Sequence, residues 1–111
     1  MSLTESQRFA GIALEAQRRS IALVEFIIAK TKLLDRLHGK INARQEKALL
    51  RIFQEGPEGI KGGLSAGNYV SITGASPATT TRDLVDLVEK GALARSGTLK
   101  HARYVLKLPK S

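Results

Sequence analysis

The stretch TGASPATTTRDLVDLVEKGAL, residues Thr73–Leu93, predicts a helix whose two ends differ in character. Ser76 is a favourable N-cap residue, and Pro77 suits the first helical position, where no backbone N–H is needed. Gly91 follows the last turn, where a left-handed residue ends many helices. The later turns carry an apolar stripe formed by Leu84, Leu87 and Val88. Because the first turn is polar and rich in threonine, we expect it to contact something other than the protein core.

Helical spacing divides the residues near this first turn between two faces. Thr80 lies four residues before Leu84 and is therefore expected to face the core with it. Thr79 and Arg82 fall on the outer side, whereas Thr81 lies between the two faces. Small hydroxyl side chains at a helix N-terminus allow close approach to DNA and can donate hydrogen bonds to phosphates or bases.

Arg82 is the best candidate on this helix for a contact with a guanine or a phosphate. The alternative is an intrahelical ion pair with Asp86, four residues later. Asp83, Asp86 and Glu89 make the later part of the helix acidic. Only the first turns, beginning at the Ser76 cap, are therefore expected to lie close to DNA.

Two further helices are predicted before this stretch. Asn42 and Gln45 have the spacing of a capping box for a helix that ends at GPEG. Its inward stripe consists of Ala48, Leu49, Ile52 and Phe53. The connector GPEGIKGG lacks the spacing of a phosphate-binding P-loop, so we expect an exposed loop with a short strand at residues 63–64. Ser65 then caps a short helix. Its apolar contacts are expected from Tyr69, Val70 and Ile72.

A basic hairpin is predicted after Gly91, because the apolar period changes from helical to two over residues 93–108. Ser96-Gly97 supplies the turn. Lys100, His101 and Arg103 follow it and are candidates for neutralising DNA phosphates. The alternative is a solvated hairpin tip whose charges face only water.

Residues 5–38 are predicted to form one long helix, because apolar residues recur at spacings near three, four and seven. Its middle segment, IALVEFIIA, is apolar on nearly every side, and such a helix must be buried on every side. The domain downstream can cover only one side. We therefore expect a second copy of the chain, or a neighbouring domain, to cover the rest.

The composition points to a polyanionic partner. The chain has 111 residues, of which 18 are Lys or Arg and 10 are Asp or Glu, for a formal net charge of +8. The absence of cysteine excludes disulfides and thiol chemistry, and two distant histidines offer little for a metal, so no cofactor, metal site or catalytic residue is expected. Neither a signal peptide nor a membrane-spanning stretch is recognisable, which favours a cytoplasmic protein. Phe53, Tyr69 and Tyr104 fall at core positions rather than on a base-stacking platform.

The order helix, short strand, helix, glycine turn, helix and basic hairpin is that of a winged helix-turn-helix. The predicted fold is therefore mainly α with a small β-hairpin (α+β), in which residues 1–38 form a long helix and residues 41–108 a domain. In this architecture the third helix, about 77–90 here, enters the major groove of double-stranded DNA. The wing, about 94–108, lies against the backbone or the minor groove.

One long segment resembles the C-terminal winged-helix segment of many bacterial Fic-family proteins. It is INARQEKALLRIFQEGPEGIKGGLSAGNYVSITGASPATTTRDLVDLVEKGAL, together with ARY at residues 102–104. The resemblance covers roughly residues 41–108. It implies that Thr79, Thr81 and Arg82 belong to a recognition helix and Arg103-Tyr104 to a wing. Pro77 stands where relatives often carry a basic residue.

Proteins of that family carry this unit after a nucleotidyl-transfer core with the motif HPFxxGNGR, which does not occur in this sequence. The transfer activity is therefore not carried over, and we expect no enzyme. The leading hypothesis is a non-catalytic DNA-binding domain that regulates transcription. The alternative is an interaction module without DNA binding, whose long helix forms a homodimer or packs on a Fic core.

Overall fold

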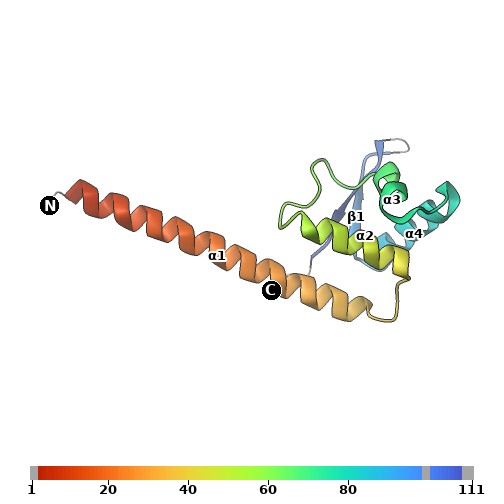
Figure 1. The fold of residues 1–111 in the computed structure, drawn as a ribbon, viewed down its shortest axis with the longest axis horizontal. Helices are drawn as coiled ribbons and strands as arrows, with labels where there is room; N and C mark the ends of the chain where they lie inside the picture. The colour runs from red at the N-terminus through yellow and green to blue at the C-terminus, as the bar shows by residue number, and fades with distance from the viewer. Residues whose placement is uncertain (1–2, 99–100, 109–111) are drawn as a thin grey trace.

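The computed structural model describes residues 3–98 and 101–108, with side chains from Ser20 onward. These residues form four helices, α1 (Leu3–Leu37), α2 (Ala43–Gln54), α3 (Ala66–Thr73) and α4 (Pro77–Glu89), and two strands, β1 (Leu93–Ser96) and β2 (Arg103–Leu106). The strands pair antiparallel. The predicted fold class, mainly helical with a small hairpin, is confirmed (Figure 1).

Helix α1 gives the molecule an elongated shape, because most of its length projects away from the other elements (Figure 1). The principal extents are 66 × 29 × 20 Å, and the radius of gyration is 18.2 Å. A compact chain of this length would have a radius of gyration of about 13 Å. Among the side chains described from Ser20 onward, α1 enters the core through Ala29, Leu33 and Leu37 near its C-terminal end. The predicted long helix is confirmed, and none of the described helices has the length and apolar character of a membrane span.

The predicted helix starts are confirmed by their capping hydrogen bonds. The Asn42 side chain accepts from the Gln45 backbone N–H at 2.8 Å, and the Gln45 side chain accepts from the Asn42 N–H at 2.9 Å. Ser65 and Asn68 form the same reciprocal pair at the start of α3. Gly74 ends α3 in the left-handed conformation, with φ of 73°, which lets the chain turn sharply into α4.

The loop between α2 and α3 joins the hairpin through a single β-bridge. Leu64 and Tyr104 exchange two backbone hydrogen bonds, of 2.8 and 2.9 Å, where the sequence predicts a short strand. Gly63 is required beside this bridge, because its φ is +85° and an added Cβ would lie 3.1 Å from the Arg103 Cβ. The bridge therefore ties the position of the hairpin to that of α3.

One core holds the domain together. Its buried members come from every element: Leu33, Leu37, Ala48, Leu49, Ile52, Phe53, Leu64, Tyr69, Leu84, Leu87, Ala92, Leu93 and Tyr104. The predicted stripes of α2 and α4 lie in it, although Val88 is only partly buried. The three aromatic side chains expected in the core are confirmed there.

One expectation about burial is wrong, and one acidic residue is buried. Val70 was expected to supply apolar contacts, but it is exposed because Tyr69 takes the inward position on α3. Asp83 is one of the three acidic residues in the later part of α4, and only 5% of it is exposed. It lies beside Leu84 on the side of the helix that faces α2 and α3. There Arg44 and Tyr69 donate hydrogen bonds to its carboxylate.

Candidate nucleic-acid interface

The inner side of α4 is anchored by the carboxylate of Asp83. One oxygen accepts from Arg44 Nε at 2.8 Å and from the buried hydroxyl of Tyr69 at 2.7 Å. The other accepts from Asn42 Nδ2 at 3.0 Å and from Arg44 Nη2 at 3.2 Å. We call these four residues the Asp83 cluster. It joins α4 to the start of α2 and to α3, and it uses both oxygens of the carboxylate, as buried charges require.

The Asp83 cluster shifts the pKa values of its members in opposite directions. Burial opposes the charge of Asp83, but hydrogen bonds from Arg44, Tyr69 and Asn42 outweigh it and hold the pKa of the carboxyl below its ordinary value. Burial, together with the bond to this carboxylate, raises the pKa of the Tyr69 hydroxyl. Asp83 is therefore a charged acceptor at neutral pH, and Tyr69 a neutral donor.

The C-terminal half of α4 is fixed by a second group of contacts. Asp86 accepts from Lys90 Nζ at 2.6 Å and from Gln45 Nε2 at 2.8 Å, and these bonds lower the pKa of its carboxyl. Arg36, near the end of α1, donates to the carbonyls of Lys90 and Gly91 at the end of α4. A cation at this position also complements the helix dipole. The end of α4 is therefore held by α1 and α2 together.

The N-terminal turn of α4 is capped as the sequence predicts. Ser76 Oγ accepts from the Thr79 backbone N–H at 3.2 Å and donates to Thr79 Oγ1 at 3.0 Å. The bond between the two hydroxyls uses one of their two protons and leaves the other for a ligand. Ser76 is exposed and Thr79 half-buried, so this pair of candidate residues offers one donor to a phosphate at the start of α4.

Thr81 and Arg82 both face solvent, which resolves the ambiguity over Thr81. The Thr81 hydroxyl donates to the carbonyl of Pro77 at 3.1 Å, so it can accept but not donate outward. Arg82 is exposed, and its side chain makes no ion pair or hydrogen bond with any described residue. The alternative pairing of Arg82 with Asp86 is wrong, because Asp86 is bound by Lys90 and Gln45.

The predicted inward position of Thr80 is confirmed, since only 1% of it is exposed. Its hydroxyl has no hydrogen-bond partner among the described residues. A buried hydroxyl without a hydrogen-bond partner is uncommon in a folded protein. Thr80 thus anchors the first turns of α4 by packing, while Thr81 on one side is exposed and Thr79 on the other is half-buried.

The hairpin brings a second set of cations to the same domain. Strand β1 contacts α4, and on it Arg95 is exposed, although the sequence pattern did not single it out. Arg103 is partly buried on β2 and donates to the Ala102 carbonyl at 3.1 Å. His101 is exposed at the tip, whereas Lys100 lies outside the described residues.

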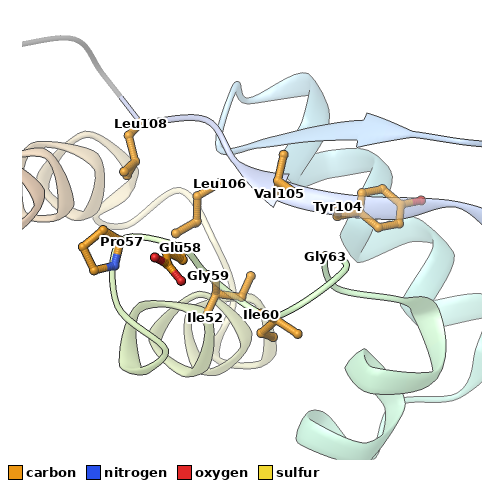
Figure 2. Close-up of a pocket in the computed structure, with 10 residues that line it drawn as sticks. All are labelled: Ile52, Pro57, Glu58, Gly59, Ile60, Gly63, Tyr104, Val105, Leu106 and Leu108. Atoms are coloured by element: carbon orange, nitrogen blue, oxygen red, sulfur yellow. The ribbon is translucent and has the colours of Figure 1, made fainter.

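The glycine-rich connector borders an apolar pocket rather than a phosphate cradle. A small pocket of about 100 Å³ lies between the end of α2, this loop and β2. Figure 2 shows aliphatic side chains around it, among them Ile52, Ile60 and Leu106, with the Glu58 carboxylate at its side. A carboxylate repels a phosphate, so this pocket is not suited to bind one.

No protein-family model matches the chain, and a search of characterised proteins gives no significant match. The resemblance to the Fic-family segment therefore stays a prediction from the quoted motifs. The geometry divides the six candidate residues that the structure describes into groups. Arg82 carries free donors, Ser76 and Thr79 share one hydrogen bond and leave one hydroxyl proton free, Thr81 has its hydroxyl proton in use, and Arg103 and His101 lie on the hairpin.

Proposed function

We propose that residues 41–108 form a non-catalytic winged helix-turn-helix that binds double-stranded DNA and regulates transcription. In this proposal the N-terminal turns of α4 enter the major groove. The hairpin acts as the wing, where Arg95 and Arg103 contact the phosphate backbone. The order of the elements, the net charge and the Fic-family resemblance all favour this function.

The state of Arg82 is the observation that carries the proposal. An exposed guanidinium that has no partner within the described part of the chain, in the first two turns of a helix, is suited to a bidentate contact with guanine or a phosphate. Its neighbour Asp83 would repel a polyanion if it faced outward. Instead that carboxylate is buried and saturated by hydrogen bonds. The outer side of the first turns of α4 therefore presents a cation and hydroxyls, and the neighbouring carboxylate of Asp86, which is partly exposed, is bound by Lys90 and Gln45.

Fluorescence anisotropy with a labelled duplex of mixed sequence tests this proposal. For three phosphate contacts, affinity is expected to fall roughly 40-fold between about 50 and 200 mM salt. Arg82→Ala is expected to weaken binding by about 1–3 kcal/mol. Lys32→Ala is the matched control, because it removes one exposed positive charge from α1, away from α4.

Equal weakening by the Arg82 and Lys32 variants would show that only net charge matters and would exclude a specific interface on α4. Binding weaker than millimolar at low salt would remove DNA as a partner. Because neither variant alters a buried residue, thermal unfolding of both is expected to match that of the parent chain.

A second candidate function, protein interaction through α1, is favoured by one observation. Five large aliphatic side chains on α1 are between 43% and 58% exposed: Ile21, Leu23, Val24, Ile27 and Ile28. Exposed apolar patches of this kind often mark interaction sites. A second copy of the chain, or a Fic-type core in a longer protein, would cover them.

Sedimentation velocity distinguishes these two partners. If α1 pairs with a second copy, the chain dimerises at high concentration and Ile27→Asp abolishes the dimer. A monomer at every concentration would exclude the homodimer and leave the packing of α1 on another domain.

A further inference from the structure

A second surface, separate from the proposed DNA interface, is an open groove of about 530 Å³ between α2 and α3. One wall is formed by Lys47 and Arg51 on α2 with Glu55 at its C-cap, and Lys61 on the connecting loop extends it. None of the residues that line it comes from α4 or the hairpin. The groove can therefore be occupied independently of the surface around Arg82.

The walls of the groove carry uncompensated positive charge. Arg51 forms an ion pair with Glu55, four residues later at the C-cap of α2. Lys47 and Lys61 are exposed, and their ammonium groups have no partner among the described residues. Three cations thus face one anion, so the groove attracts an acidic ligand.

The floor of the groove is apolar, which decides between classes of acidic ligand. Ile60 and Ile72 line it, partly buried against the core. The sugar-phosphate backbone of DNA offers little aliphatic surface with which to cover two isoleucines. A peptide segment that alternates carboxylates with aliphatic side chains satisfies both the walls and the floor.

We propose that this groove binds an acidic segment of a partner protein, with one or two aliphatic side chains on Ile60 and Ile72 and carboxylates beside Lys47 and Lys61. Asn68 and Ser71, on the α3 wall, add polar groups for the peptide backbone. This inference does not depend on DNA binding. It would give a DNA-bound or a DNA-free protein a separate docking site.

The test uses the full chain and a fluorescein-labelled twelve-residue peptide in which glutamate alternates with leucine, in buffer of about 150 mM salt. We expect Lys47→Glu or Lys61→Glu to weaken binding of the peptide several-fold, and both together at least about tenfold. Lys32→Glu is the matched control, since it makes the same change of charge on α1 and is expected to leave affinity nearly unchanged.

A second peptide, with serine in place of every leucine, tests the role of the floor and is expected to bind distinctly more weakly. Equal binding of the two peptides, or equal weakening by Lys32→Glu and Lys47→Glu, would overturn the proposal. So would a loss of duplex DNA binding as large as the loss of peptide binding in the Lys47 and Lys61 variants, because the groove would then be a phosphate site.

Discussion

The inner and outer sides of α4 use adjacent residues in opposite ways. On the inner side, Thr80 and Asp83 are buried, and the Asp83 carboxylate binds groups from α2 and α3. On the outer side, Thr81 and Arg82 are exposed, and Arg82 has no partner among the described residues. The comparison teaches that an Arg and an Asp adjacent in sequence need not form an ion pair with each other. Helical geometry separates the two charges, so one holds the helix and the other is left for a ligand.

The same contrast shows how the backbone that carries Arg82 is held. The middle of α4 is fixed by the Asp83 cluster, the next turn by the bond between Gln45 and Asp86, and the end by Arg36. The outer side of the helix therefore lies in one orientation relative to α1, α2 and α3. Preorganisation of this kind reduces the entropy lost on binding.

The largest expected effect comes from removing the inner anchor. Asp83→Ala leaves the buried Tyr69 hydroxyl and the Arg44 guanidinium without their acceptor, and we expect a loss of about 3 kcal/mol in the free energy of unfolding. Urea denaturation followed by circular dichroism measures it. Arg82→Ala, one residue earlier, is expected to change stability by less than about 0.5 kcal/mol.

Asp83→Asn refines this comparison, because it keeps an acceptor but removes the charge. An intermediate loss is expected. If Asp83→Ala and Arg82→Ala had the same small effect on the urea midpoint, the distinction between an anchoring and a free side of α4 would be wrong.

The second-largest effect is expected from acid, which lowers the free energy of unfolding that Asp83 and Asp86 contribute. The pKa values of Asp83 and Asp86 are lowered in the folded protein, so the unfolded chain, with an Asp pKa of about 3.9, takes up protons first as the pH falls. The stability that these two carboxylates contribute is therefore complete above about pH 5 and is lost as the pH falls through about 4 toward the lower folded values.

Urea midpoints measured from neutral pH to about pH 3 check this dependence. Asp83→Asn removes one of the two titrating groups, so its stability is expected to fall less steeply over the same interval. A variant that loses as much stability as the parent chain would show that carboxylates elsewhere cause the acid sensitivity.

Local features of the fold could be predicted because they depend on neighbours in sequence. The Asn42–Gln45 and Ser76 caps, the apolar stripe around Leu84 and the hairpin after Gly91 are all set within a few residues. The position of Arg82 on the outer side also follows from spacing alone.

The partners of these residues could not be predicted, because they come from distant segments. Asp83 binds Tyr69, 14 residues away, and Asn42, 41 residues away. Spacing within α4 permitted an Arg82–Asp86 pair. It gave no sign that Gln45 would bind Asp86 instead. The charges of α4 were therefore visible in the sequence, whereas their assignment to an inner or an outer role required the structure.

Thr80 offers the smallest and most specific test of the inner side. Its buried hydroxyl has no partner among the described residues, whereas the hydroxyl of Thr81 is exposed and bonded to the Pro77 carbonyl. Thr80→Val keeps the shape of the side chain and removes an unsatisfied polar group, so the free energy of unfolding is expected to stay level or rise by up to about 1 kcal/mol. Thr81→Val is the matched control and is expected to change stability by less than about 0.5 kcal/mol. A loss of more than about 0.5 kcal/mol in Thr80→Val would mean that the hydroxyl has a partner in solution, such as a buried water, and that the inner side is held by polar contacts throughout.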